Sequence, residues 1–309
     1  YFMFLMLFLV IAYFVDAYQK KELPRFFKAS SVLLVAFALG ALMNITTLYH
    51  TYEYSKHTMR GKSELVKPDS ENQTDSGLER SYITAWSYGV GETFTLMIPN
   101  VKGGASVPLG ANEAAMEKAD RQYVALYGQI GQYWGEQPGT SGPVYVGAFV
   151  CFLFILGCII VKGPIKWALL GGTIFSILLS WGHNFMGLTD FFIDYVPMYS
   201  KFRTVASILV IAEFTIPLLA LFALKKLLDE PQLIKSKVTL ISFAATAGLC
   251  LLFALLPTLF FPNYISANEM AQFQGGLPAE HLQAFIANLT AVRQSIFTAD
   301  AWRSFAIIL

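Results

Sequence analysis

Seven apolar runs, set apart by polar segments, most constrain what this chain can fold into. Inside a bilayer every backbone N–H and C=O must find a partner within the protein, and an α-helix supplies those partners within one segment. One helical crossing takes about 20 predominantly apolar residues. The runs cover residues 1–15, 31–47, 144–161, 169–181, 205–224, 238–261 and the stretch that begins at Phe305.

The composition agrees with a membrane location. Hydrophobic residues make up 55% of the 309-residue chain and charged residues 14%, whereas soluble domains average about 45–50% and about 25%. We therefore predict an all-α, polytopic (multi-pass) membrane protein. Because the chain starts at Tyr1 rather than methionine and stops at Leu309 within an apolar run, we expect an internal fragment with truncated end helices.

Lysine and arginine indicate how the runs are oriented, since cationic loops resist translocation. Four basic residues lie in 19–28, two in 162–166 and four in 225–237, and these are alternate connections. We place those turns in the cytoplasm. The predicted organisation is two membrane helices in 1–48, a periplasmic region in 49–143, four membrane helices in 144–261 with an outward loop at 182–203, a periplasmic loop in 262–301, and the start of a further helix in 302–309.

The outward region 49–143 has two parts of different character. Residues 56–79 are charged and polar with almost no large apolar side chains, so they bury too little surface to order themselves and we expect a flexible segment. Residues 111–130 place apolar positions among acids and bases, a pattern that predicts one or two surface helices.

Glu92 is the first candidate catalytic residue. It follows Tyr88, Gly89 and Gly91 and precedes an apolar stretch. A carboxyl group on a loop that approaches the bilayer has its pKa raised by desolvation, which suits a general base. The alternative is that Glu92 caps a short helix by interacting with the positive end of the helix dipole.

Asp190 and Asp194 are the second candidates. If a helix begins at Thr189, their four-residue spacing puts both carboxylates on one face, where they could hold a divalent cation or divide acid and base roles. The alternative is that Thr189 and Asp190 form a helix N-terminal cap. The requirement for a metal stays open at this stage.

Substrate-binding candidates are cationic or aromatic. Lys201 and Arg203, separated by one aromatic residue before the fifth run, suit the phosphate of a lipid carrier, although they could equally be interfacial anchors. We expect sugar to bind between the aromatic residues Trp86, Tyr88 and Trp134.

Glu213 is the acid placed well inside an apolar run, and ionisable residues at that depth are functional by default. Pro217, four residues on, has no N–H to donate to the Glu213 carbonyl, so the helix is opened at this point. Glu213 could carry protons or contact substrate, or it could be a protonated residue bonded inside the bundle.

Other classes of function find little support. A formal charge of +1 argues against a nucleic-acid partner. The sequence has no phosphate-cradling glycine loop with lysine and no Gly-x-Ser-x-Gly elbow. Cys151, Cys158 and Cys250 all lie in apolar runs, so we expect no disulfide framework.

Three stretches resemble the bacterial YfhO-type membrane proteins, in the version found in Bacteroidota: SYGVGETFTLMIPN at 87–100, YWGEQPGTSGPVYVG at 133–147 and PMYSKFRTVA at 197–206. The resemblance implies a GT-C-like helical bundle in the bacterial cytoplasmic (inner) membrane, acting on its outer face with a polyprenyl-phosphate-linked sugar. It also implies that the main catalytic acid lies upstream of Tyr1. Glu92, Glu136, Lys201 and Arg203 match the motifs by position only.

The leading hypothesis is therefore a glycosyltransferase that moves sugar from a polyprenyl-phosphate carrier to a cell-envelope polymer or lipid. Its partners would be the lipid bilayer, the carrier-linked sugar and the envelope acceptor. The alternatives are a transporter or flippase of a lipid-linked precursor, in which Glu213 would be the working residue, and a non-catalytic scaffold for envelope assembly. Outward polar mass favours the enzyme, because a transporter's site lies near the membrane midplane.

Overall fold

The computed structural model describes residues 1–58, 60–61, 72, 74, 78–276 and 278–309. Within these ranges the regular secondary structure is helical, apart from an isolated bridge between Pro108 and Gly131. The prediction of an all-α chain is confirmed. The expected flexible segment 56–79 lies largely outside the described residues.

The chain forms two compact units. Unit 1 comprises Tyr1–Ser87 and Lys162–Ala212, and unit 2 comprises Tyr88–Val161 and Glu213–Leu309. Helix α10 (Val210–Asp229) begins in the first and continues in the second. The other elements of unit 1 are α1 (Phe2–Gln19), α2 (Leu23–Met43), α3 (Ile45–Ser55), α4 (Arg80–Ile83), α8 (Pro164–Ser180), η3 (Gly182–Phe185), α9 (Met186–Tyr195), η4 (Tyr199–Lys201) and η5 (Val205–Leu209). Those of unit 2 are η1 (Gly91–Leu96), η2 (Leu109–Ala111), α5 (Glu113–Met116), α6 (Val124–Tyr127), α7 (Ala148–Ile160), η6 (Pro231–Lys235), α11 (Lys237–Leu255), α12 (Pro257–Phe260), α13 (Ala267–Gly276) and α14 (Ala279–Ile308).

Several helices suit a membrane crossing. Among the described residues, four are long and apolar enough to cross: α1, α2, the η5–α10 segment and α11. A fifth crossing is added if α8 and the segment Gly182–Tyr195, bent by 109° relative to each other, form one span. These helices indicate a multi-pass membrane protein, as the sequence predicts.

The apolar run 144–161 gives a shorter helix than expected. Helix α7 has 13 residues, or about 20 Å at 1.5 Å per residue, whereas a hydrocarbon core is about 30 Å thick. The chain before it is tied to η1: the Thr95 hydroxyl donates to the Val144 carbonyl (3.1 Å) and the Val146 N–H donates to the Leu96 carbonyl (3.1 Å). More than half of α7 is buried, and it packs against α11 and α14. By length it falls short of a full span, although Phe149 and Ile159 are exposed on its surface.

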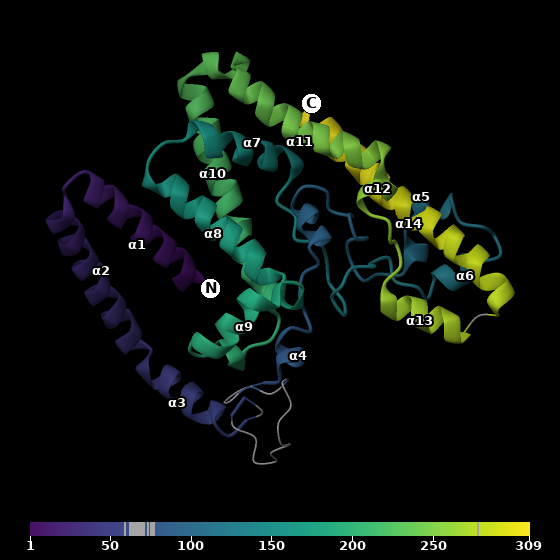
Figure 1. The fold of residues 1–309 in the computed structure, drawn as a ribbon, viewed down its shortest axis with the longest axis horizontal. Helices are drawn as coiled ribbons and strands as arrows, with labels where there is room; N and C mark the ends of the chain where they lie inside the picture. The colour runs from purple at the N-terminus through teal and green to yellow at the C-terminus, as the bar shows by residue number, and fades with distance from the viewer. Residues whose placement is uncertain (59, 62–71, 73, 75–77, 277) are drawn as a thin grey trace. The chain divides into compact units, whose positions relative to one another are not determined.

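In unit 1, helix α1 lies along α8 (Figure 1). Phe4 of α1, Phe175 of α8 and Phe192 of α9 pack ring against ring, with centroids 5.2 to 5.8 Å apart. Such contacts join helices that share one apolar core. Helix α2 contacts α1 but has no buried residue, so its apolar side chains are all available to lipid.

In unit 2, helices α11 and α14 run side by side (Figure 1). The segment 262–301, expected to be a periplasmic loop, is instead mostly helical, because α13 and the 30-residue α14 occupy it. Phe285, Leu289, Val292 and Ile296 are buried at helical spacing against the region of α5 and α6. The predicted helices within 111–130 are confirmed as these two short elements.

Arg293 of α14 is fully buried and ties together three segments of unit 2. One guanidinium nitrogen donates to the Tyr264 carbonyl (2.8 Å), and the other donates to the Gly131 carbonyl (2.7 Å). Both also donate to the Glu269 carboxylate of α13, at 2.9 and 2.5 Å. Burial alone would raise the pKa of Glu269, but the hydrogen bonds and charge of Arg293 outweigh it and hold that pKa below its usual value.

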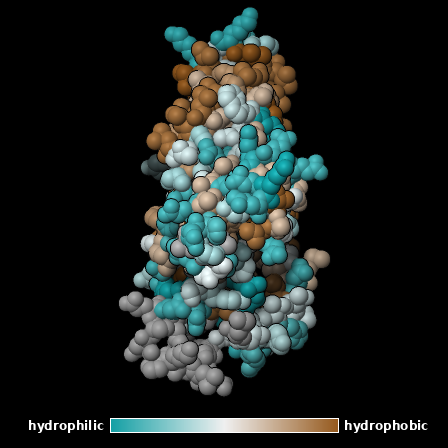
Figure 2. All heavy atoms as spheres, turned by 90° about the vertical axis from the view of Figure 1, so that its right-hand side faces the viewer, coloured by the Kyte–Doolittle hydropathy of each residue, from teal (hydrophilic) through white to brown (hydrophobic). Residues whose placement is uncertain are grey.

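Polar and apolar surfaces are segregated on the face of the molecule drawn in Figure 2. Hydrophobic atoms gather towards the top of this view, and hydrophilic atoms cover most of the area beneath them. A protein that is partly embedded in lipid and partly in water has this distribution.

We expect Arg293→Met to destabilise the protein by about 3–5 kcal/mol, because it leaves Glu269 half-buried without its cation. The measurement is thermal unfolding in detergent. The matched control is Arg25→Met, because Arg25 pairs with Glu22 at 4.0 Å but the two side chains are 87% and 53% exposed and such pairs contribute little. Equal melting temperatures for the two variants would contradict the structural role of Arg293.

Candidate functional site

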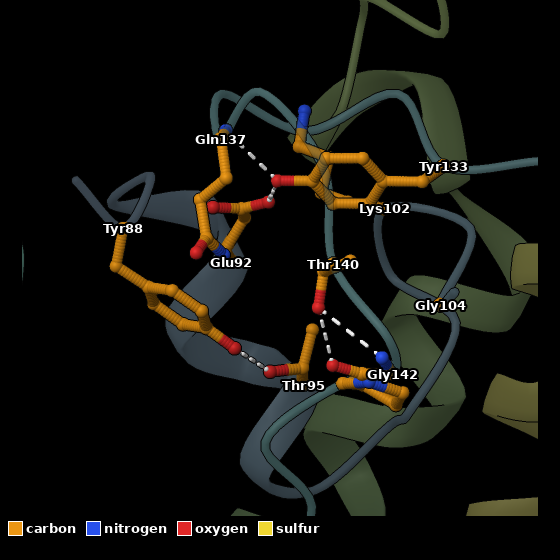
Figure 3. A pocket seen from close by; sticks show the side chains of 10 residues that line it. Tyr88, Glu92, Thr95, Lys102, Gly104, Tyr133, Gln137, Thr140 and Gly142 are labelled. Carbon is orange, nitrogen blue, oxygen red and sulfur yellow. Dashed lines mark hydrogen bonds between the residues drawn. The ribbon is translucent and has the colours of Figure 1, made fainter. Parts of the chain in front are cut away.

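A small pocket in unit 2 brings together polar side chains from three parts of residues 88–143 (Figure 3). η1 supplies Glu92 and Thr95, and the loop that follows it supplies Lys102. The remaining lining residues are Tyr88, Gly104, Tyr133, Gln137, Thr140, Gly142 and Pro143. Its cavity volume is about 10 Å³, enough for about one water molecule.

Glu92 lies in the first turn of η1, and both of its oxygens accept a hydrogen bond. The Gly89 N–H donates to Oε2 (2.7 Å), and the Tyr133 hydroxyl donates to Oε1. The same Tyr133 oxygen accepts from the Gln137 N–H (3.0 Å). Figure 3 shows the tyrosine hydroxyl and the carboxylate pointing at each other. The carboxylate is therefore fixed in orientation, and the Glu92 residue is 1% exposed.

Burial sets the electrostatics of the pocket. Desolvation raises the pKa of Glu92, and the nearby Glu136 charge adds to this, whereas the hydrogen bonds from Tyr133 and Gly89 and the charge of Lys102 oppose it. Desolvation likewise lowers the pKa of Lys102, although both acids act in the other direction. The pKa of Tyr133 is raised by burial and then by the neighbouring Glu92. A desolvated, oriented carboxyl group is a stronger proton acceptor than an ordinary glutamate.

The helix-start alternative for Glu92 also has structural support. The side chain accepts from the backbone N–H of Gly89, just before η1 begins, and Glu92 is the acid of the first turn. Such a contact holds the turn in place. Glu92 can both hold the turn and act as a base, because Gly89 donates to Oε2 whereas Tyr133 donates to the other carboxylate oxygen, Oε1.

Three further predicted residues lie around this pocket in different settings. Tyr88 lines it, and its hydroxyl bonds to the Thr95 hydroxyl (2.5 Å). Glu136 is exposed beside it. Trp134 is instead 3% exposed, with its ring against Tyr264 and beneath the Arg293 guanidinium (5.4 Å from the ring centroid). The Trp134 ring therefore packs the interior and offers no open face for a sugar.

In unit 1, Asp190 and Asp194 do share a helix face, and Arg80 occupies it. One guanidinium nitrogen of Arg80 lies 2.6 Å from Asp190 and the other lies 2.6 Å from Asp194. The predicted helix start at Thr189 is wrong, because α9 begins at Met186 and Phe185 is its N-cap. Thr189 donates instead to the Gly182 carbonyl (2.8 Å). The two carboxylates are thus paired with an arginine, and among the described residues no group of three or more potential ligands could hold a metal ion.

Arg203 and Lys201 are also in unit 1. The Arg203 guanidinium stacks over Trp86 (5.0 Å to the ring centroid) and Tyr82 (5.4 Å), and it donates to the Tyr82 hydroxyl (2.8 Å). Cations bind such ring faces. The Trp86 ring, predicted to bind a sugar, therefore carries the Arg203 guanidinium on one face. Lys201 donates to the Arg60 carbonyl (2.7 Å).

Glu213 is exposed near the start of α10, and Pro217 lies inside that helix as expected. The alternative of an acid bonded inside the bundle does not fit an exposed side chain. Its proposed part in transport stays a prediction.

Sequence reasoning missed three residues at the candidate groups: Tyr133, which donates to Glu92, Lys102, which lines the same pocket, and Arg80, which pairs with the two aspartates. Tyr133 begins one of the three motif stretches, which was the available signal for it. Nothing local marked Arg80, because its partners lie 110 and 114 residues away.

Comparison with known proteins adds no further constraint: no protein-family model, no curated protein and no solved structure matches this chain.

Gly135 is required by the close approach of the chain to the carboxylate. A Cβ at this position would overlap the Glu92 Oε1 and the Tyr133 hydroxyl. We expect Gly135→Ala to push the two apart and to cost about 1–3 kcal/mol, read as a lower melting temperature in detergent. Gly142→Ala is the matched control, because its Cβ would meet nothing within 4 Å. Equal stability of both variants would contradict this packing.

Proposed function

We propose that this chain is part of a membrane glycosyltransferase that moves a sugar from a polyprenyl-phosphate carrier to a hydroxyl group of a cell-envelope acceptor. The reaction takes place on the outer face of the bacterial cytoplasmic membrane. The observation that carries the proposal is Glu92, a desolvated carboxylate oriented by Tyr133 and Gly89 in a polar pocket. The likeness of three stretches to the YfhO-type proteins supports the class of reaction and a GT-C-like fold, whereas the role of Glu92 rests on the pocket alone.

In the proposed reaction Glu92 is the general base. Its carboxylate takes the proton of the acceptor hydroxyl as that oxygen forms a bond to the anomeric carbon of the sugar. The bond from the anomeric carbon to the carrier phosphate breaks, and its electron pair leaves with the polyprenyl phosphate. Charge and atoms balance without another reactant.

Each neighbour of Glu92 has a definable part in this step. Tyr133 fixes the direction of the carboxylate, and the Gly89 N–H leaves Oε2 partly neutralised. Burial makes the carboxylate hold a proton more tightly, which favours proton transfer from a hydroxyl. The hydroxyl groups of Tyr88, Thr95 and Thr140 line the same pocket, and neutral hydroxyls are suited to bonding a sugar.

We expect Glu92→Gln to lower sugar transfer by about 10²–10⁴-fold, the usual contribution of a general base. The full-length protein would be assayed in membranes with a polyprenyl-phosphate sugar and envelope acceptor. Glu117→Gln, an exposed acid beside α5, is the matched control and should keep full activity. Full activity of the Glu92 variant would refute the assignment, and loss of substrate movement in Glu213→Gln alone would favour the transporter.

The rate should depend on pH through Glu92. A base acts when ionised, so kcat/KM should rise with pH, with a midpoint above the ordinary glutamate value of 4.5. Tyr133→Phe removes a hydrogen bond that lowers this pKa, so its profile should shift to still higher pH. The charged groups near Glu92, namely Glu136 and Lys102, are unchanged in that variant. A midpoint at or below 4.5, or no shift in Tyr133→Phe, would count against Glu92 as the base.

A further inference from the structure

Glu92 is closed off from solvent in this structure. The residue is 1% exposed, and the cavity beside it, about 10 Å³, has room for about one water molecule. The envelope acceptor that carries the reacting hydroxyl group is much larger than this space. If Glu92 is the base proposed above, part of its surroundings must move before the acceptor can reach it.

One segment covers the carboxylate. Gly135 lies directly against the Glu92 Oε1 and the Tyr133 hydroxyl, so closely that no side chain fits there. Further along the same segment Gln137, Thr140, Gly142 and Pro143 line the pocket. We call residues 135–143 the strap.

Both ends of the strap are anchored. Before it, the Trp134 N–H donates to the Lys102 carbonyl (3.0 Å), and the Trp134 ring is buried beneath Arg293. After it, the Val146 and Gly147 N–H groups both donate to the Leu96 carbonyl (3.1 and 3.2 Å). The Val144 carbonyl accepts from the Thr95 hydroxyl. Movement is therefore confined to the residues between the anchors.

Hydrogen bonds join the strap to Tyr133 and to Ser106. Its backbone is not helical, and its nine residues include three glycines and two prolines. Gln137 donates to the Tyr133 hydroxyl (3.0 Å), and Thr140 exchanges two hydrogen bonds with Ser106: Ser106 N–H to the Thr140 carbonyl (2.8 Å) and Thr140 N–H to the Ser106 hydroxyl (2.9 Å). A glycine-rich segment without regular secondary structure opens at a lower free-energy cost than a packed helix does.

We propose that the strap is a lid on Glu92: residues 135–143 swing away between their two anchors to admit the acceptor, and close again over the reacting groups. Closure excludes water, which would otherwise compete with the acceptor hydroxyl for the sugar. The Ser106–Thr140 pair is the latch. Its two hydrogen bonds do not involve Glu92, so they can be altered while the hydrogen bonds to Glu92 stay intact.

The lid can be locked with a disulfide. Ser106→Cys with Thr140→Cys places two thiols on residues whose backbones are already within hydrogen-bond distance, as a disulfide requires. Access to Glu92 is then measured on the full-length protein with a water-soluble carbodiimide and glycine ethyl ester, which label carboxyl groups that reagent can reach. Mass spectrometry reads the rate at Glu92, with exposed Glu117 as the internal control and the cross-linked peptide as proof of the lock.

The expected result is that oxidation of the double variant stops labelling at Glu92 and that reduction restores it, with Glu117 unchanged throughout. A second variant, Ser106→Ala, loosens the latch by removing one hydrogen bond. Its labelling rate at Glu92 should rise about fivefold, the factor that corresponds to about 1 kcal/mol for one such bond.

Labelling separates this inference from the proposed function, because it needs no sugar donor and no turnover. Equal labelling rates at Glu92 in the locked, wild-type and Ser106→Ala proteins would overturn the lid, whatever Glu92→Gln does to transfer. Conversely, the expected changes in labelling together with full activity of Glu92→Gln would keep the lid and refute the base. If both hold, the oxidised double variant should transfer sugar more slowly than the same variant after reduction.

Discussion

The buried guanidinium of Arg293 is the interaction on which the candidate site depends. A cation without access to water needs acceptors, and the two terminal nitrogens of Arg293 find them in Glu269, in the Tyr264 carbonyl and in the Gly131 carbonyl. Its plane also covers the Trp134 ring. Residues 131 and 134 are thus fixed to helix α14, and Tyr133 between them reaches Glu92. The geometry of the catalytic candidate Glu92 thus depends on a charge about 200 residues further along the chain, on helix α14.

The uniformly apolar helices could be predicted from the sequence, because mean hydropathy depends only on residues that are neighbours in the chain. It did not identify α14, whose polar positions lower the average. The signal was present in another form: Phe285, Leu289, Val292 and Ile296 recur at steps of four, three and four, and all four are buried. A search for apolar residues at helical spacing would have found α14, whereas a search for segments of high mean hydropathy did not.

The candidate residues themselves could be predicted from the sequence around them, but their partners, which lie far away in the sequence, could not. Glu92 stood out from its own neighbours, and the spacing of Asp190 and Asp194 correctly placed them on one face. Their partners could not be read in this way, since Tyr133 lies 41 residues from Glu92 and Arg80 more than 100 from the aspartates. Two carboxylates four residues apart on a helix can bind any cation that lies nearby in the folded protein, and here that cation is the Arg80 side chain. Residue type alone does not distinguish that outcome from a metal ion.

Helix α2 is a segment that buries none of its residues. With no side chain buried by protein neighbours, its tilt and depth depend on bilayer thickness and on the charged residues that flank it. Many different apolar sequences of the same length would form an equally suitable membrane helix at this position. Its amino-acid order is therefore nearly free to drift, and a thicker or thinner membrane would disturb it more than most substitutions would.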